Sequence, residues 1–414
     1  MQIYQVGGAI RDELLGTKVK DRDWVVTGAT PEAMLALGYK QVGKDFPVFL
    51  HPDSKEEYAL ARTERKVASG YHGFTFDTST EVTLEQDLLR RDITINAIAR
   101  DSDGALIDPF NGQRDLEARI IRHISPAFAE DPLRVLRVAR FSARLDFDVA
   151  AETLDLMQQL SASGELQTLP PERIWVEMEK ALNGEQPRRF FQVLRDCGAL
   201  QAILPELDKL FGVPQPPQHH PEIDSGLHTL LSLDVACRLS DDPVVRFAVL
   251  VHDLGKGTTP AEMLPAHHGH EERGVKLIKQ LATRLHIPKK YRELAVIVSH
   301  YHLICHRVAE LRATTILKYL EAMDAFRRPQ RFADFLLACE ADARGRTGLE
   351  DRDYPQAGYF QTCLAACQAV DTGTLTATGL QGLELAAALR QERLKAVKKA
   401  TKPLNNQDST VADH

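Results

Sequence analysis

The stretch Lys20-Asp21-Arg22-Asp23-Trp24-Val25-Val26 decides how the first part of this chain is interpreted. The apolar residues after Asp23 predict a β-strand. Side chains on a strand alternate between its two faces, so Asp21 and Asp23 are expected to point the same way. Two such carboxylates repel each other unless a cation joins them, and hard oxygen ligands suit Mg²⁺ or Mn²⁺. For this pattern alone, a solvated strand end is the alternative.

A second feature lies just upstream of these carboxylates. Tyr4-Gln5-Val6 predicts a short strand that runs into Gly7-Gly8, and Arg11-Asp12 opens a helix-like stretch. Glycines let backbone N–H groups approach a phosphate closely, and Arg11 adds a charged contact. An anion cradle followed by metal-binding carboxylates is what nucleotidyl transfer requires.

Four ordered motifs carry a resemblance to a known family: Val6-Gly7-Gly8-Ala9-Ile10-Arg11-Asp12, then Asp21-x-Asp23, Arg90-Arg91-Asp92 and Glu130-Asp131-Pro132-Leu133-Arg134. Over roughly residues 1–145 they resemble the class II tRNA nucleotidyltransferases, which comprise CCA-adding enzymes and bacterial poly(A) polymerases. The resemblance implies an α+β fold. A polymerase-β-like nucleotidyltransferase domain with a small mixed sheet is expected first, followed by an all-α neck and body.

The same resemblance implies roles for individual residues. Asp21 and Asp23 are expected to be the catalytic carboxylates and to share Mg²⁺. Contacts to the nucleotide are expected from Gly8, Arg11, Arg91, Asp131, Arg134, Arg137 and Arg140. Asp92 and Asn96 would brace this site. Glu57 is a candidate third carboxylate on a neighbouring strand, with a plain surface glutamate as the alternative.

The series Asp131-x-x-Arg134-x-x-Arg137-x-x-Arg140 predicts a helix that Asp131 caps, with Pro132 in its first turn. Steps of three residues wind these side chains along about 13.5 Å of helix, which matches the length of an NTP. A solvated, charged helix is the alternative. On their pairing edges C and A both present an amino donor beside a ring-nitrogen acceptor, which Asp131 and Arg134 complement. The hypothesis is therefore that the substrates are CTP and ATP.

A second motif, His252-Asp253-Leu254-Gly255-Lys256, follows an apolar run and resembles the HD metal-dependent phosphohydrolases. His252 and Asp253 are expected to be catalytic, and the expected metal ligands are His228, His252, Asp253 and Asp342. Weaker ligand candidates are His270 and His300, and a surface histidine cluster is the alternative for His267-His268-Gly269-His270. The resemblance implies hydrolysis of 2′,3′-cyclic phosphates, 2′-nucleotides and other phosphate esters with Ni²⁺ or another divalent transition metal.

Composition places the chain among globular proteins with several domains, since 414 residues are 43% hydrophobic and 26% charged. No apolar run approaches the ~20 residues that span a bilayer, and no signal-peptide layout is present. The six cysteines lack metal spacing, which predicts reduced thiols and a cytoplasmic location. Although the net charge is −7, residues 114–144 hold seven arginines against four acids, which fits a defined RNA or nucleotide contact.

The expected organisation has four parts: a nucleotidyltransferase head at 1–140, a tRNA-binding neck and body at 141–225, an HD domain at 226–345 and a helical C-terminal region at 346–414. The proline-rich residues 213–221 predict an exposed connector. Helices are expected over Leu227–Leu239, Val244–Val251 and Leu383–Lys399, and a frayed tail over Thr401–His414.

The sequence therefore predicts template-independent addition of C, C and A to the 3′ end of tRNA, with tRNA, CTP and ATP as partners, beside a phosphohydrolase active as phosphodiesterase, 2′-nucleotidase and phosphatase. A monomer or homodimer without membrane contact is expected. The closest alternative is a poly(A) polymerase. Two others are an HD phosphohydrolase with a nucleotide-sensing N-terminal domain and a non-catalytic RNA-binding protein.

Overall fold

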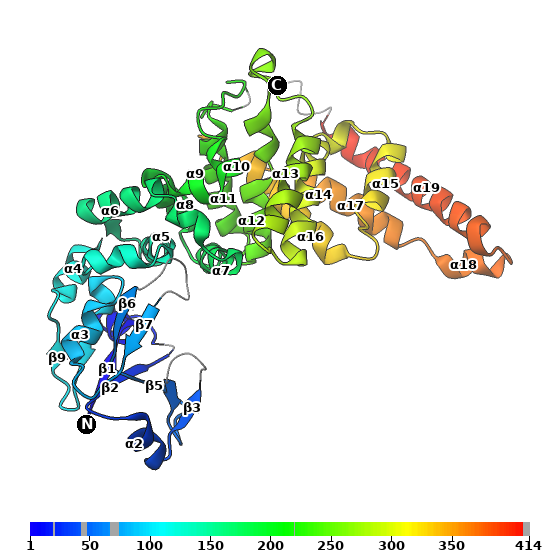
Figure 1. Ribbon diagram of the computed structural model, residues 1–414. Helices are drawn as coiled ribbons and strands as arrows, with labels where there is room; N and C mark the ends of the chain where they lie inside the picture. Colours follow the sequence, from blue (N-terminus) through cyan, green and yellow to red (C-terminus); the bar gives the residue numbers. More distant parts are fainter. Residues whose placement is uncertain (20, 43–47, 67–73, 219, 409–414) are drawn as a thin grey trace. The chain divides into compact units, whose positions relative to one another are not determined.

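The computed structural model describes residues 1–19, 21–42, 48–66, 74–218 and 220–408. The chain divides into two compact units, Met1–Ile203 and Leu204–His414. The first unit combines a sheet with helices, and the second is helical (Figure 1). The predicted α+β class, with a small mixed sheet followed by helical regions, is confirmed. The finer division at residues 140, 225 and 345 stays a prediction.

A seven-stranded mixed sheet organises the first unit, with the order β3-β4-β5-β2-β1-β8-β9. Strand β2 lies at its centre, antiparallel to β1 and parallel to β5. The strands of this sheet are β1 (Gln2–Val6), β2 (Asp23–Thr27), β3 (Lys40–Val42), β4 (Val48–Leu50), β5 (Glu57–Leu60), β8 (Ala99–Arg100) and β9 (Leu106–Ile107). Two smaller pairs are the hairpin β6 (Thr63–Lys66) with β7 (Phe74–Asp77), and β10 (Ile120–Ile121) with β11 (Asp148–Val149).

The two faces of the sheet bury different apolar clusters, as strand alternation requires. Val25 packs in a cluster with Leu84 and Leu88 of helix α3 (Leu84–Leu89). Its neighbour Val26 packs in the other cluster, with Phe49 and other residues of the opposite face. Because Asp23 lies two residues before Val25, its side chain belongs to the α3 face.

Helix α5 carries the predicted arginine series. It spans Leu133–Leu145, and its apolar side chains, Val135, Leu136 and Val138 among them, are buried. Its N-cap residue is Pro132, not Asp131 one position earlier, and Pro132 therefore precedes the helix instead of lying in its first turn. The capping contact expected of Asp131 is made nevertheless, since its Oδ1 accepts a hydrogen bond from the backbone N–H of Leu133 at 3.0 Å. The other helices of the unit are α1 (Gly8–Leu14), α2 (Pro31–Ala36), α4 (Gly112–Ala118), α6 (Ala151–Ala162), α7 (Pro171–Leu182), α8 (Pro187–Asp196) and α9 (Ala199–Ile203).

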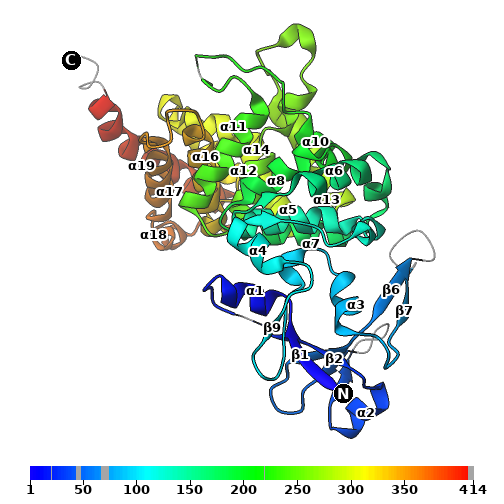
Figure 2. The same ribbon diagram turned by 90° about the vertical axis from the view of Figure 1, so that its left-hand side faces the viewer.

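In the second unit, helices α11, α12, α14 and α16 lie side by side (Figures 1 and 2). Asp224 and Asp242 cap α11 and α12 with side-chain hydrogen bonds, which fixes where these helices begin. The helices are α10 (Pro205–Asp208), α11 (Ser225–Leu239), α12 (Pro243–Val251), α13 (His270–Arg284), α14 (Lys289–His306), α15 (Ala313–Ala322), α16 (Pro329–Arg344), α17 (Pro355–Gln368), α18 (Thr372–Ala377) and α19 (Gly382–Asp408).

Two sequence expectations need correction here. The proline-rich stretch is not simply exposed, because Gln215 is buried and accepts a hydrogen bond from Nζ of Lys256 at 2.5 Å. The C-terminal helix does not end near Lys399 but continues to Asp408, and residues 409–414 lie outside the described residues.

The cysteine and membrane expectations can be compared directly with the structure. All six cysteines are free, and all but Cys237 are buried. In the described part of the chain, no helix has both the length and the apolar character that a membrane span needs.

Candidate active sites

The carboxylates of the first unit meet at the start of strand β2. Only Asp23 belongs to the strand, since β2 begins there and Asp21 lies just before it; the expectation that both lie within the strand is wrong. Glu57 is the register partner of Asp23 on the parallel strand β5. All three residues line one cavity of about 730 Å³. Pairing of β2 with β5 therefore brings a third carboxylate to the predicted pair.

The electrostatics of Asp23 fit a divalent cation. Burial raises the pKa of Asp23, the guanidinium of Arg91 opposes this shift, and the nearby Asp21 carboxylate reinforces it. Within the described residues, no ion pair engages Asp21, Asp23 or Glu57. Carboxylate oxygens are ligands that Mg²⁺ or a similar hard ion prefers.

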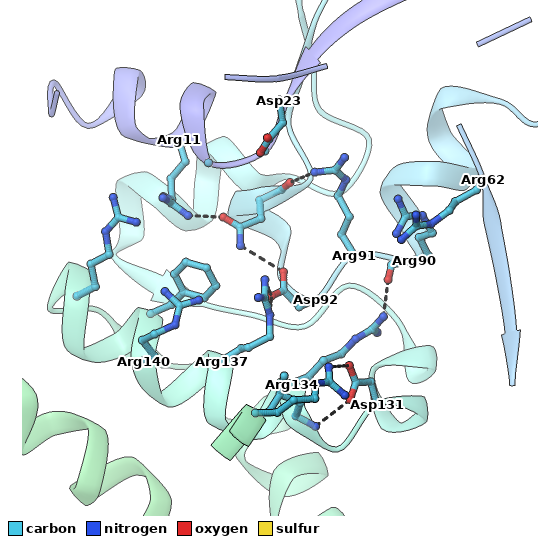
Figure 3. Close-up of a pocket in the computed structure, with 17 residues that line it drawn as sticks. Arg11, Asp23, Arg62, Arg90, Arg91, Asp92, Asp131, Arg134, Arg137 and Arg140 are labelled. Atoms are coloured by element: carbon cyan, nitrogen blue, oxygen red, sulfur yellow. Dashed lines mark hydrogen bonds and ion pairs between the residues drawn. The ribbon is translucent and has the colours of Figure 1, made fainter. Parts of the chain in front are cut away.

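A second cavity of the first unit, of about 560 Å³, is strongly cationic (Figure 3). Asp23 reaches its wall, which brings the carboxylate site and this cavity together. Its other described lining residues include two aspartates and nine arginines: Asp92, Asp131, Arg11, Arg62, Arg90, Arg91, Arg134, Arg137, Arg140, Arg144 and Arg173. Such an excess of guanidinium groups suits a polyanion with the charge of a nucleoside triphosphate.

Arg11 is fixed from three sides at the start of the chain. Its Nη1 donates to Oδ1 of Asn96 at 2.5 Å, and its Nε and Nη2 donate to Oδ1 of Asp12 at 2.9 and 2.7 Å. The other carboxylate oxygen of Asp12 accepts from Nη2 of Arg144 at 2.7 Å. The ring of Phe141 lies 5.1 Å from the guanidinium carbon of Arg11. A rigid guanidinium beside the Gly7-Gly8 turn results.

Asp92 and Asn96, predicted to brace the site, link Arg11 to helix α5. Nδ2 of Asn96 donates to Oδ1 of Asp92 at 3.2 Å, and Nε of Arg137 donates to Oδ2 of Asp92 at 2.7 Å (Figure 3). Burial opposes ionisation of Asp92, but Arg137 and the hydrogen bond from Asn96 outweigh it and lower the pKa of Asp92. The anion cradle and the arginine helix are thus joined by one buried network.

The arginine series of α5 is held by partners on several elements. Arg140 donates to buried Glu177 of α7 at 2.5 Å and lies 4.1 Å from the centre of the Phe141 ring. Arg134 donates to the backbone oxygens of Ala127 and Arg90. These contacts fix the guanidinium groups of the series before a ligand binds.

Three residues in and behind the arginine-lined cavity were not predicted from the sequence: Arg62, Arg173 and Glu177. For Glu177 the sequence did contain a signal. Oδ2 of Asp131 accepts from Nη2 of Arg173 at 3.2 Å. Neither Arg62 nor Arg173 belongs to a motif. Glu177 occupies an apolar position in the helical pattern of α7, between Ile174 and Ala181, and a buried acid on such a face predicts a basic partner.

In the second unit, four buried histidines surround one point. Nδ1 of each ring lies within 3.1 Å of a main-chain carbonyl oxygen; the rings belong to His228, His252, His270 and His302. A carbonyl oxygen only accepts, so Nδ1 carries the hydrogen and the lone pair of each ring is on Nε2. Nε2 of His270 and Nε2 of His302 are 3.4 Å apart, and Nε2 of His228 is 3.0 Å from Oδ1 of Asp342. A positive charge, from a bound cation or a proton on one ring, would stabilise acceptors this close.

The two buried aspartates of this cluster, Asp253 and Asp342, also favour a positive charge at its centre. Nε2 of His252 lies 3.2 Å from Oδ2 of Asp253 and 3.6 Å from Oδ1 of Asp342, and Nε2 of His270 lies 3.3 Å from Oδ1 of Asp253. Although burial opposes it, Asp253 and Asp342 raise the pKa of His252 to about 10, so a positive charge is favoured here. The nitrogen and carboxylate donors also suit a divalent transition metal. His228, His252, Asp253 and Asp342, all predicted ligands, lie together in this cluster.

Of the two weaker metal-ligand candidates, His270 lies in the cluster and His300 does not. His270 belongs to the cluster, and it and His267 are buried, so the surface-cluster alternative is wrong for these two residues. His300 is not in the metal-ligand groups of the described residues; His302 takes this place. The helical pattern of buried positions in α14, at Tyr291, Leu294, Val298 and Cys305, includes position 302 and excludes 300.

Three families match the chain in succession. Residues 3–122 match the Poly A polymerase head domain, residues 146–211 the probable RNA and SrmB-binding site of polymerase A, and residues 226–328 the HD domain. The Multifunctional CCA protein of Thioalkalivibrio sulfidiphilus is 61% identical over 401 residues, which cover 96% of this chain and 98% of that protein.

Two solved structures are similar in fold. A complex of CCA-adding enzyme with CTP has a TM-score of 0.63 at 22% identity, covering 96% of this chain and 87% of that one. A complex of CCA-adding enzyme with ATP has a TM-score of 0.63 at 20% identity, covering 97% and 88%. At these identities the likeness concerns the fold alone.

Proposed function

Because this chain belongs to the family of multifunctional CCA proteins, we propose that it adds C, C and A to the 3′ end of tRNA from CTP and ATP. The observation that carries this proposal is the arginine-lined cavity that shares Asp23 with the group Asp21, Asp23 and Glu57. One wall suits a triphosphate, and the adjoining carboxylates suit the divalent cation that such chemistry uses.

The reaction is a displacement at phosphorus. The 3′-hydroxyl oxygen of the tRNA attacks the α-phosphorus of the NTP, the bond to the bridging oxygen breaks, and pyrophosphate leaves. Asp21, Asp23 and Glu57 would hold Mg²⁺, which when bound supplies charge neutralisation and activation of the hydroxyl. The guanidinium groups of Arg11, Arg91, Arg137 and Arg140 hold the triphosphate, and fixing it in line lowers the entropic part of the barrier.

Base choice is assigned to Asp131 and Arg134, which both line the cavity. The carboxylate accepts the amino group shared by C and A, and the guanidinium donates to the ring nitrogen beside it. Support comes from the backbone contacts that fix Arg134 and from the capping contact that fixes Asp131. U and G would leave both groups facing the wrong partner, which costs buried hydrogen bonds.

For the second unit we propose metal-dependent hydrolysis of phosphate esters, with 2′,3′-cyclic phosphates and 2′-nucleotides as substrates. His228, His252, Asp253 and Asp342 would hold Ni²⁺ or a similar ion, which supplies Lewis acidity and a nucleophilic water when bound. Buried Lys256, with Nζ 2.6 Å from Oδ2 of Asp253, offers a charge beside the phosphate. Together the two units would repair a damaged tRNA end in the cytoplasm.

The deciding experiment offers the protein a tRNA transcript that lacks its terminal CCA, with each NTP alone and all four together. Incorporation limited to two CMP and one AMP supports the proposal. A long run of AMP would instead favour a poly(A) polymerase. Absence of any incorporation, with phosphodiesterase activity retained, would favour a hydrolase with a nucleotide-sensing domain. The His252→Ala variant, which leaves the first unit intact, is the control that assigns hydrolysis to the second.

A further inference from the structure

Glu222 is a buried acid directly behind the metal-ligand cluster of the second unit. It follows the proline-rich stretch and precedes α11, and its side chain is only 2% exposed. Oε1 lies 3.1 Å from Nδ1 of His228 and 3.0 Å from Nδ1 of His220. Oε2 accepts from the backbone N–H of Thr347, beyond the end of α16. Glu222 thus touches the segment after the helix that carries Asp342 as well as His228 itself.

Among the described histidines of the cluster, His228 has the nearer and more deeply buried carboxylate beside Nδ1. Nδ1 of His252, His270 and His302 faces main-chain carbonyls, and Nδ1 of His270 also lies 3.5 Å from Oε2 of Glu271, whose side chain is 26% exposed. Nδ1 of His228 faces the carbonyl of Gly345 at 3.0 Å and, in addition, the Glu222 carboxylate. A carboxylate behind an imidazole fixes its tautomer, raises the basicity of the far nitrogen and so strengthens it as a metal ligand.

The charges around the cluster lead to the same conclusion. The charged side chains of the cluster that the structure describes and that are less than a tenth exposed are the carboxylates of Glu222, Asp253 and Asp342, at 2%, 1% and 5%, and the ammonium group of Lys256, at 8%. With neutral imidazoles these four charges sum to −2, which one divalent ion neutralises. Without Glu222 the loaded site would carry a net buried positive charge, and buried net charge is costly.

We infer that Glu222 is a positioning residue that strengthens His228 as a ligand and supplies the charge that matches a divalent ion. This rests on the proposed metal-dependent function of the second unit. It goes beyond that proposal because Glu222 does not touch the ion; it acts through His228. A second ion held by His220, Glu222 and His228 is not favoured, since the carbonyl of Gly345 keeps the hydrogen on Nδ1 of His228.

The experiment measures Ni²⁺ affinity and stoichiometry on the metal-stripped full chain by calorimetry, with the visible absorption of bound Co²⁺ as a second readout. Glu222→Gln keeps the shape and an acceptor oxygen but removes the charge, so it separates the electrostatic role from a structural one. Glu262→Gln, on an exposed turn of the same unit, is the matched control. Far-UV circular dichroism and thermal unfolding of each metal-stripped variant report whether the second unit is folded.

The expected result is one Ni²⁺ per chain and, for Glu222→Gln, an affinity lower by roughly 10- to 100-fold with a changed Co²⁺ spectrum. Glu262→Gln and His220→Ala should bind like the unaltered protein. If Glu222→Gln binds Ni²⁺ as tightly as the unaltered protein, the inference about Glu222 is wrong, but the proposed hydrolase stands. The same holds if a second ion binds to the unaltered protein and His220→Ala removes it. Failure of the unaltered protein to bind either metal would overturn both the inference and the proposed hydrolase.

Discussion

Asp23 and Glu57 are register partners on the parallel strands β2 and β5, so their backbones lie side by side at the strand ends that line the carboxylate cavity. In the proposed site, the carboxylate of Glu57 on the neighbouring strand would complete the oxygen set that Asp21 and Asp23 begin. Strand pairing thus places a third acid beside the acidic pair, and three carboxylates would suit a hard divalent cation.

The first prediction concerns Glu57→Gln. Loss of a residue that only orients a metal ligand lowers metal affinity or activity by roughly 10- to 100-fold. Loss of a direct ligand should therefore lower kcat for CMP incorporation by at least about 100-fold. Raised Mg²⁺ should recover part of the activity. The control is Glu85→Gln, an exposed position on α3. Unchanged kcat for Glu57→Gln would make Glu57 a surface glutamate, as the alternative interpretation has it.

The second prediction compares two glycines. Gly7 and Gly16 both have positive φ, +76° and +68°, and an added Cβ strains such a backbone by about 1–2 kcal/mol. A Cβ on Gly7 would lie 2.9 Å from Nη1 of Arg91, whereas one on Gly16 meets open space. Both alanine variants should lose stability in denaturant unfolding. Only Gly7→Ala should raise KM for CTP, and an equal KM in the two variants would contradict the role assigned to Arg91.

The third prediction concerns pH and the Asp92–Arg137 pair. The pKa of Asp92 is lowered in the fold, so its contribution to stability is present above the unfolded pKa of about 3.9 and is lost as the pH falls through the lower folded value. Asp92→Asn should reduce the free energy of unfolding by about 1–3 kcal/mol at pH 7. The difference between the two proteins should shrink below about pH 4. A difference that is independent of pH would contradict an ionised Asp92.

The fourth prediction separates two histidines of α14. His302→Ala should weaken Ni²⁺ binding by at least about tenfold, because its Nε2 faces the cluster, whereas His300→Ala should leave binding unchanged. Calorimetry on both variants is the measurement. A loss of binding in His300→Ala and not in His302→Ala would restore the ligand set expected from the sequence.

These sites show what the sequence could and could not supply. Local patterns predicted the strand at Trp24 and the capping contact of Asp131, because period and capping act over a few residues. The HD ligands were expected from the resemblance to a family, since His228 and Asp342 are 114 residues apart in the chain. The approach of Glu57 to Asp23 depends on strand pairing, and the Asp12–Arg144 bond joins residues far apart in the chain. Such contacts are fixed by tertiary packing, which no local pattern encodes.

His302 and Glu222 were not predicted from the sequence, for two different reasons. The buried stripe of α14 contains position 302, so helical period favours His302 over His300 as the inward-facing histidine. Glu222 lies in an irregular segment whose path is set by contacts such as the backbone bond from Gln215 to Ile223. No periodicity reveals that its side chain turns inward.

Single-turnover incorporation of CMP and AMP by the double variant Asp21→Asn/Asp23→Asn tests most directly whether the paired carboxylates hold the cation, with the hydrolase activity of the second unit as internal control. We expect incorporation to be abolished while phosphodiesterase activity is retained. Incorporation at the rate of the unaltered protein would contradict this expectation, because the paired carboxylates would then not hold the cation on which the transfer depends.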